Sequence, residues 1–431
     1  MGKRGKRERQ EGLWIATSSI VEAPGHAFYE LLNEILSRHG FDERVEHLCE
    51  RYYRGPRGRP SIAPGTYFRM LMVGFFEGLD SERAIAWRVA DSLSLRKFLG
   101  YGLDERTPNH STISRTRRLY WLSTHQAVFG WVVKVLSEEG LLRGKTVAID
   151  ATTLEANAAM RSIVRRDTGA GYEEYLKKLA AEAGLEEPSR EELARFDRKR
   201  KKKSSNRDWT HPHDPDARIT KMKDGRTHLA YKAEHAVDLE SGALLAVTLH
   251  GADQGDTTTI FETLEEAETA ALEIGTNGVE EVVTDKGDHS DDVCVGLRDW
   301  GVRSYASEPD RGRRRWKGKR DDQQQVYANR RRVRGERGAR LQKKRGELVE
   351  RSFAHMYETG GMRRLHLRGK RNILKRLVLH GAAFNLALLM RTLMGAGTPR
   401  QAAHRLTGLV CDVFSTLWRP FRRLLVPVTL S

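Results

Sequence analysis

The sequence predicts an α/β protein in which an all-helical part precedes a part that combines strands with helices. Between about Trp14 and Glu139 the apolar residues recur every three or four positions, as in residues 28–36, which is typical of amphipathic helices. From Lys145 onwards, short β-branched runs alternate with helical stretches, which indicates buried strands covered by helices. No internal repeat is visible, so a repeat architecture is excluded.

The strands are expected in a definite order. Lys145 to Asp150 is a β-branched run that ends in a carboxylate. Residues 228–238 and 243–249 alternate in polarity around a short turn and are predicted to form a hairpin. The run Glu280 to Asp285 repeats the first pattern, because it too is apolar and closes on an Asp. The remaining expected elements are a strand at 302–306 and helices at about 258–272, 290–300, 341–357 and 372–393.

The chain length and the change of pattern predict the domain boundaries. At roughly 100–200 residues per domain, 431 residues correspond to about two or three domains. A helical insertion is expected at about 156–225, where Ser189 and Glu192 have capping-box spacing and a Lys-rich run follows. The expected units are a basic tail at 1–13, an all-α domain at 14–140, an α/β domain at 141–395 and a C-terminal tail at 396–431.

The composition indicates an intracellular protein with a polyanionic partner. There are 75 Lys and Arg against 58 Asp and Glu, a formal net charge of +17, which favours binding to nucleic acid. Three widely spaced cysteines exclude a disulfide framework and a paired-cysteine zinc site, so a reducing, cytoplasmic location is expected. The most apolar stretch, 374–394, is interrupted by Lys, Arg and His. No membrane span or secretory signal is therefore expected.

Two segments are candidates for contact with DNA. After Asn109, a capped helix would carry arginines on its exposed side, as in the recognition helix of a helix-turn-helix, although basic surface helices are common. Residues 311–345 hold 16 Lys or Arg and three acidic residues, which favours contact with the DNA backbone over a solvated loop. The residues expected to contact DNA are Arg115, Arg117, Arg118, Arg313, Arg314, Arg315, Lys317, Arg330, Arg331 and Arg345.

Carboxylates at the ends of two predicted strands form a candidate site for chemistry. Asp150 and Asp285 each close an apolar strand, and sheet proteins gather ligands at the carboxyl ends of strands. A third carboxylate on a nearby helix would complete an oxygen-rich site of the kind that suits Mg²⁺. Glu347 and Glu350 are both available on the helix after the basic segment, and periodicity does not choose between them. Asp at a strand end is often only a turn former, and Asp238, Asp253 and Asp256 are interpreted in that way, with orientation of a triad member by one of them as the alternative.

Several short blocks of the chain match a known family. These blocks are 147–153, 283–287, 345–353, 369–376 and 384–386. They resemble the motifs of the DDE transposases of bacterial insertion sequences, and residues 58–112 look like the helical domain that precedes the catalytic domain in that family. The resemblance covers about Phe28 to Arg391. It implies a ribonuclease-H-like mixed sheet with flanking helices and a helical insertion, preceded by an all-α DNA-binding and dimerisation domain.

The same resemblance implies a site and a reaction. Asp150, Asp285 and Glu350 would be the catalytic and metal-binding triad, because a Val-Glu-x-x-Phe pattern matches at Glu350, and Glu347 is the reserve third carboxylate. Two Mg²⁺ ions, with Mn²⁺ as a substitute, would support in-line phosphoryl transfer. Water would first free a 3′-hydroxyl at the transposon end, and that hydroxyl would then attack target DNA. The expected partners are the terminal inverted repeats, target DNA and a second copy of the chain in the active complex, with no membrane.

The catalytic helix departs from the family pattern at one position. Many relatives carry a Tyr and an Arg before the Glu and a Lys seven positions after it, whereas here that later position is Tyr357. The Lys role is therefore unassigned, and Arg345 and residues 327–330 are candidates for the Tyr and Arg roles. Two rival functions share the fold: a nuclease that only hydrolyses nucleic acid, and a catalytically silent DNA-binding protein. The presence of three carboxylates argues against the second rival.

Overall fold

The computed structural model describes residues 25–53, 61–185, 187–200, 205–222, 225–310, 312 and 314–405. Within these ranges the chain is an α/β protein with one main mixed sheet and many helices, which confirms the predicted class. The expected basic tail at 1–13 and residues 406–431 of the expected C-terminal tail lie outside the described residues.

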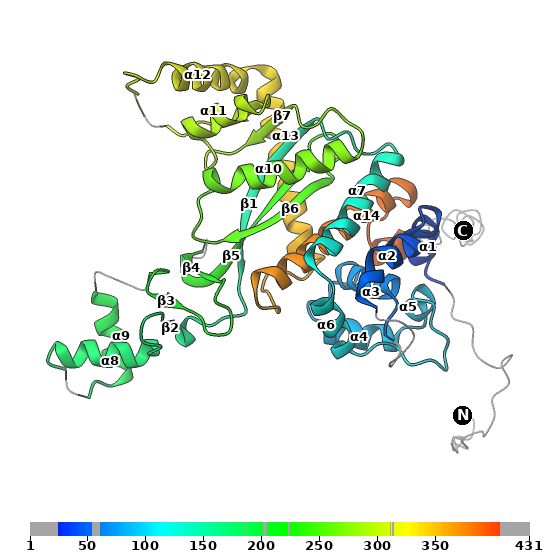
Figure 1. Cartoon of the computed structure of the whole chain (residues 1–431), viewed down its shortest axis with the longest axis horizontal. Coiled ribbons are helices and arrows are strands. Elements are labelled where there is room, and N and C mark those ends of the chain that lie inside the picture. Colours follow the sequence, from blue (N-terminus) through cyan, green and yellow to red (C-terminus); the bar gives the residue numbers. More distant parts are fainter. Residues whose placement is uncertain are drawn as a thin grey trace, which may run out of the picture.

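The N-terminal part is helical, as the spacing of its apolar residues predicts (Figure 1). The side chains of Ser81, Ser92 and Asn109 each accept a backbone N–H at a helix start. Large apolar residues such as Phe28 and Phe68 are fully buried between the helices. The elements are α1 (Ala27–Arg38), α2 (Phe41–Cys49), the 3-10 turn η2 (Glu50–Tyr52), α3 (Pro64–Phe76), α4 (Glu82–Asp91), α5 (Leu93–Phe98), α6 (His110–Leu119) and α7 (Leu122–Glu138).

The central strand of the main sheet is β1 (Thr146–Glu155), and its antiparallel neighbour is β5 (Thr227–Asp238). The other edge of β5 pairs with β6 (Leu244–Gly251) and β4 (Arg218–Lys221), so the predicted hairpin is confirmed. The prediction that the first strand ends at Asp150 is wrong. β1 continues to Glu155 because residues 151–155 form a ladder with β5, which leaves Asp150 in the middle of the strand.

On its opposite edge, β1 runs parallel to β7 (Glu281–Thr284), and β8 (Arg303–Ala306) runs parallel to β7. Helix α11 (Asp291–Asp299) connects β7 to β8, and α12 (Arg320–Arg334) contacts both α11 and β8. The strand order is therefore an antiparallel group on one side of β1 and a parallel group on the other.

The two faces of the sheet are covered by different helices. Alternate residues of β5 point to opposite faces: Lys232 contacts α10 (Asp256–Glu273), whereas His235 contacts α13 (Glu336–Glu358). Because Asp150 is the antiparallel partner of His235, its side chain lies on the α13 face. The pleat of the strand thus decides which helix meets the predicted catalytic carboxylate.

A separate subdomain occupies the segment where a helical insertion is expected, and it lies beside the sheet opposite the N-terminal helices (Figure 1). It contains two helices, of which the second begins after the capping box of Ser189 and Glu192 as their spacing predicts, and also a small two-stranded sheet that no sequence pattern predicts. Leu176, Ala180 and Leu193 form its own small core. Its elements are η3 (Met160–Ser162), β2 (Val164–Arg165), α8 (Tyr172–Glu182), α9 (Arg190–Lys199) and β3 (Trp209–Thr210).

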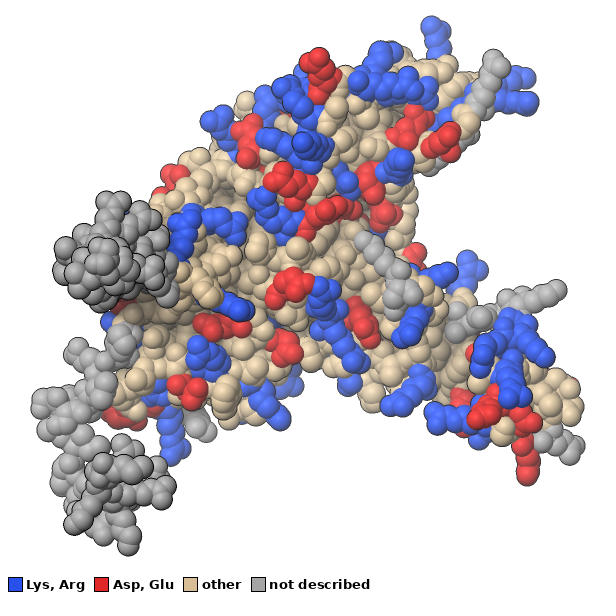
Figure 2. Space-filling view, turned by 180° about the vertical axis from the view of Figure 1, so that it is seen from behind, with Lys and Arg blue, Asp and Glu red and all other residues tan. Residues whose placement is uncertain are grey.

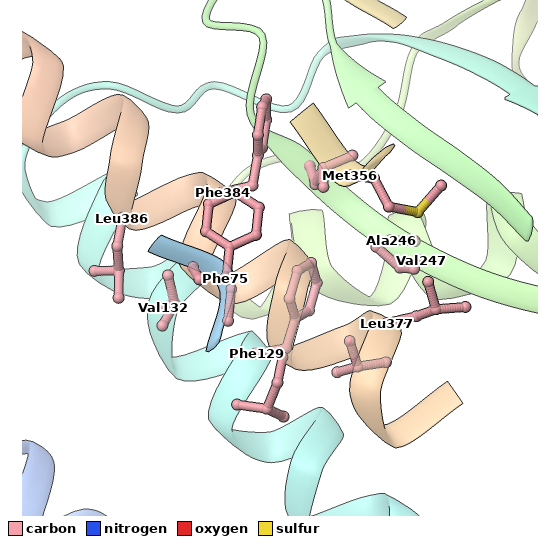
Figure 3. Close-up of a cluster of buried hydrophobic side chains, with 14 of the residues drawn as sticks. Phe75, Phe129, Val132, Ala246, Val247, Met356, Leu377, Phe384 and Leu386 are labelled. Carbon is pink, nitrogen blue, oxygen red and sulfur yellow. The ribbon is translucent and has the colours of Figure 1, made fainter. Parts of the chain in front are cut away.

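Helix α14 (Lys370–Met394) packs against α3 and α7 on one side and against β6 on the other. Figure 3 shows Phe129 of α7, Val247 of β6 and Phe384 of α14 in one apolar cluster with Phe75 of α3. By length and composition the helical stretch Lys370–Arg405 could span a membrane, but most of its apolar part is buried inside the protein. Within the described residues this helix is therefore a core helix.

Polar side chains of α14 fasten it to its neighbours. Lys375 Nζ donates to the carbonyl oxygens of Arg117 and Tyr120 at the end of α6, at 2.9 and 2.6 Å. The Asn385 side chain accepts from the backbone N–H of Leu244 and donates to its carbonyl, both at 2.8 Å, at the start of β6. Because Asn385 is fully buried, these bonds satisfy groups that water cannot reach.

Replacing Asn385 by Ala should lower the free energy of unfolding by about 1–3 kcal/mol, because the buried Leu244 N–H and carbonyl would lose their partner. The measurement is urea unfolding followed by circular dichroism. Asn372→Ala is the matched control, since Asn372 lies on the same helix and makes one exposed bond. Equal losses in the two variants would contradict a special role for Asn385.

Candidate active site

Asp150 and Asp285 lie beside one guanidinium group. Asp150 is in the middle of β1, and Asp285 directly follows β7, the parallel neighbour of β1. Nη2 of Arg345 lies 2.6 Å from Oδ2 of Asp150 and 3.7 Å from Oδ2 of Asp285. The fold therefore brings the two predicted carboxylates within reach of a single cation.

The register of β1 and β7 accounts for this meeting. Ala148 pairs with Val283, and the same register continued by two residues brings Asp150 opposite Asp285. Both strands are buried up to that point, and a one-residue slip would turn their side chains to the wrong faces. The backbone N–H of Gly287 donates to Oδ1 of Asp285 at 2.6 Å, which holds that carboxylate at the strand end.

Helix α13 is held over this face of the sheet by two aromatic side chains. Nδ1 of His235 lies 2.9 Å from Oγ of Ser352, and the imidazole stacks on Phe353 with ring centroids 4.4 Å apart. The hydroxyl of Tyr357 lies 2.6 Å from Oγ1 of Thr152 on β1. These contacts fix the rotation of α13 about its axis.

The structure distinguishes the two candidate third carboxylates by their surroundings. Glu347 is exposed and pairs with Arg351 one turn later, at 2.6 Å. Glu350 is also exposed, but it has no ion-pair partner among the residues that the structure describes. It lies seven residues before Tyr357, and this two-turn spacing places it on the side of α13 that meets Thr152.

Two further acidic residues, Asp256 and Asp288, lie beside the site, and the sequence predicts neither as a catalytic or metal-binding residue. A Cβ atom built on Gly287 would lie 2.8 Å from Oδ2 of Asp256 and 3.0 Å from Oδ1 of Asp285. Asp288 is buried, and burial together with the charges of Asp256 and Asp285 raises its pKa to about 8. The interpretation of Asp256 as a turn residue therefore misses its place next to Asp285. The only sequence signal for Asp288 is its position three residues after Asp285.

A buried polar network supports Asp256 from the opposite face of the sheet. Nζ of Lys232 lies 3.0 Å from Oδ1 of Asp256, 3.1 Å from Oε1 of Glu234 and 2.7 Å from Oγ1 of Thr259. Glu234 also accepts a hydrogen bond from Thr263 at 2.6 Å. Because Lys232 and Glu234 are almost fully buried, each charge is retained only through its partners.

Burial and neighbouring charges act in opposite directions on Asp150. Burial raises the pKa of the Asp150 carboxyl, and the nearby Asp285 adds to this, whereas the guanidinium of Arg345 lowers it. The site thus concentrates negative charge in a place where cations are strongly favoured. Within the described residues, no three His, Cys, Asp or Glu side chains converge closely enough to hold a metal ion as they stand.

The residues expected to contact DNA fall into different environments on α6. Arg115 and Arg118 are exposed, as predicted. The prediction that Arg117 lies on the exposed side is wrong: it is buried and forms an ion pair with Glu82 of α4. Helical periodicity turns Arg117 toward the bundle, and its partner comes from a different helix, so no local pattern indicates the pair.

The basic segment 311–345 is largely helical, since α12 begins at Arg320 and α13 at Glu336. Arg314 pairs with Asp291, and Arg330 pairs with Glu308, so both are partly neutralised. Arg315, Lys317 and Arg331 are exposed, and Arg313 lies outside the described residues. Figure 2 shows Lys and Arg gathered over the end of the molecule built from α11 and α12, with acidic side chains among them.

Replacing His235 by Gln should make the stability less sensitive to acid. Burial lowers the pKa of His235 to about 3, below its ordinary value of 6.5, so the unfolded chain takes up a proton that the native state excludes. The free energy of unfolding should then fall by up to about 1.4 kcal/mol per pH unit from this residue, as the pH drops from 6.5 toward 3. Urea unfolding at a series of pH values measures this slope. If the free energy of unfolding depends on pH equally in His235→Gln and in the intact protein, His235 does not cause the loss of stability in acid.

Two segments of the chain match models of known protein families. Residues 18–119 match the family model of a transposase domain (DUF772), and residues 307–390 match that of a transposase DDE domain. The second match includes α12, α13 and Glu350 but begins after β1 and β7, so it does not cover Asp150 or Asp285. No curated protein and no solved structure matches the chain. The two domain matches support a DDE transposase of an insertion sequence.

Proposed function

We propose that this chain cuts DNA at transposon ends and joins the freed 3′-hydroxyl ends to target DNA. One observation carries the proposal: Asp150 and Asp285 share one cation on the face of the sheet that α13 covers, and α13 also bears Glu350. This arrangement brings together two strand positions that are far apart in the sequence, next to the helix that bears Glu350. It supports Asp150, Asp285 and Glu350 as the catalytic triad.

We propose further that the sheet and its helices form a ribonuclease-H-like domain. The support is the mixed strand order, with an antiparallel hairpin on one side of β1 and parallel strands on the other, and the helices on both faces. The N-terminal helices α1–α7 would form the DNA-binding and dimerisation part, with boundaries near residues 14–140 for this part and 141–395 for the catalytic domain. Residues 396–431 remain the expected C-terminal tail.

The carboxylate set suits hard divalent cations. Oxygen ligands are those that Mg²⁺ and Mn²⁺ take up, and Asp150 and Asp285 already accommodate one positive group between them. Asp150, Asp285 and Glu350 would hold two Mg²⁺ ions, which would supply Lewis-acid stabilisation of the attacking and leaving oxygens. Gly287 keeps Asp285 oriented through its backbone N–H, and Tyr357 and His235 keep α13 in position.

The DNA backbone would run along exposed basic residues. Arg315, Lys317 and Arg331 flank or lie on α12, and Arg115 and Arg118 lie on α6. Such residues contribute affinity that carries little sequence information and falls with salt. Joining two transposon ends would use a homodimer acting on DNA in the cytoplasm. The rival nuclease would share the triad, and it differs in producing no joined product.

Cleavage of a labelled duplex that carries the element's own end, in the presence of Mg²⁺, tests the triad. Asp150→Ala, Asp285→Ala and Glu350→Ala should each abolish cleavage, because each removes a carboxylate from the metal-binding set. Glu347→Ala is the matched control on the same helix and should cleave as the intact protein does. Joined products with target DNA would exclude the nuclease. Binding without cleavage under any divalent ion would favour the catalytically silent DNA-binding protein.

Neutralising Arg315, Lys317 and Arg331 to Gln together should weaken DNA binding almost equally for all sequences. The slope of log Kd against log salt concentration should become shallower by about 0.9 for each phosphate that the variant no longer neutralises. Fluorescence anisotropy at several NaCl concentrations measures this slope. Arg38→Gln, an exposed arginine of α1 paired with Glu34, is the control. If the salt dependence of Kd is the same in the triple variant as in the intact protein, these three residues do not contact the DNA backbone.

A further inference from the structure

We propose that Arg345 is an internal counter-cation of the catalytic carboxylates and that a divalent metal ion must displace it. This inference rests on the proposed function, because it concerns the same carboxylates. It assigns to Arg345 a defined place in the site, whereas the sequence left two expectations for this arginine: contact with DNA, and the Arg role on the catalytic helix.

The position of Arg345 supports this role. Its guanidinium lies against Asp150 and reaches toward Asp285, and its side chain is only 14% exposed. A guanidinium located between two carboxylates occupies the space and supplies the charge that a metal ion would bring. Metal and guanidinium therefore compete for the same oxygen atoms.

The surrounding charge explains why an internal cation is needed. Asp150, Asp256, Asp285 and Asp288 act on one another electrostatically, and burial strengthens their repulsion. Lys232 compensates this charge from the α10 face, where it bonds Asp256. Arg345 compensates it from the α13 face.

The hydrogen bonds of Arg345 are incomplete in this position. Its Nε is buried and has no hydrogen-bond partner within the described part of the chain. A buried donor without an acceptor carries a desolvation cost, so the bond to Asp150 does not satisfy the whole guanidinium. Once displaced, the planar group with its five donors could take phosphate oxygens, which it matches in geometry.

Arg345 and Glu350 lie on one rigid helix, five residues apart. Displacement therefore needs only a change in the Arg345 side chain, because the contacts of His235 and Tyr357 hold the helix itself in place. The site would then exchange one bound cation for another with little movement of the backbone.

Isothermal titration of the full-length protein with Mn²⁺ tests the inference. Arg345→Gln should bind Mn²⁺ about tenfold more tightly than the intact protein, because no guanidinium competes for Asp150 and Asp285. Arg351→Gln is the matched control: Arg351 lies on the same helix, is partly exposed and pairs with Glu347, and its loss should leave the Mn²⁺ affinity unchanged. Arg345→Lys keeps a positive charge and should stay close to the intact protein.

Thermal unfolding gives a second readout that does not depend on catalysis. Without metal, Arg345→Gln should melt at a lower temperature than Arg351→Gln, because it leaves Asp150 without its counter-charge. Added Mn²⁺ should raise the melting temperature more in Arg345→Gln than in the intact protein.

The outcomes separate this inference from the proposed function. If Arg345→Gln melts cooperatively but binds Mn²⁺ no more tightly than the intact protein does, a metal ion does not displace Arg345. The proposed metal site itself would not be contradicted by that result. If neither protein binds Mn²⁺, and Asp150→Asn behaves as the intact protein does, then the proposed metal site fails and this inference fails with it.

Discussion

The burial of α14 is the constraint on which the rest of the structure depends. This helix is apolar around most of its circumference, and it lies between α7 and α3 on one side and β6 on the other. Since a helix that is buried all round must be covered on every side, α14 forces the N-terminal helices and the sheet into one continuous core. The part that precedes the sheet in sequence is thus fixed relative to Asp150 and Asp285.

The buried polar residues of α14 give this packing its specificity. Lys375 and Asn385 bond backbone groups of α6 and β6, and Arg376 Nη2 donates to the carbonyl oxygen of Leu79 at 2.6 Å. Apolar packing alone would tolerate rotation or sliding of a uniformly apolar helix. Directional bonds to three different segments allow one orientation. The Phe384-Asn385-Leu386 block is one of the segments that resemble the DDE transposase motifs. Through Asn385 it has a structural role.

Much of the fold could be predicted from the sequence because it follows from local patterns. The strands before Asp150 and Asp285 are short β-branched runs, and the helices follow three- and four-residue spacing. The meeting of these two carboxylates was predicted from the carboxyl ends of neighbouring strands, but this reason holds only for Asp285, since Asp150 lies in the middle of β1. The continuation of β1 to Glu155 was not predictable, because it depends on pairing with β5, which no local pattern of residues 151–155 indicates.

The surroundings of the site depend on contacts between distant elements, and these could not be predicted. Asp256 opens α10 after a strand, which is a common place for an Asp that only caps a turn, yet the fold places it beside Asp285. Arg345 belongs to a basic run whose composition suggests a DNA contact, yet the rotation of α13 turns it inward. A run of like charges indicates the average environment of a segment, but it does not predict the direction of each side chain.

The rotation of α13 therefore joins the two main features of the site. The contacts of His235 and Tyr357 set the rotation of α13 about its axis. This rotation turns Arg345 toward the carboxylates and Glu347 away from them. One helix thus carries an arginine at the carboxylates, a glutamate paired away from them and Glu350 on the side that meets β1. Because three roles depend on one angle, a substitution that lets α13 rotate would disturb all of them together, even far from the chemistry itself.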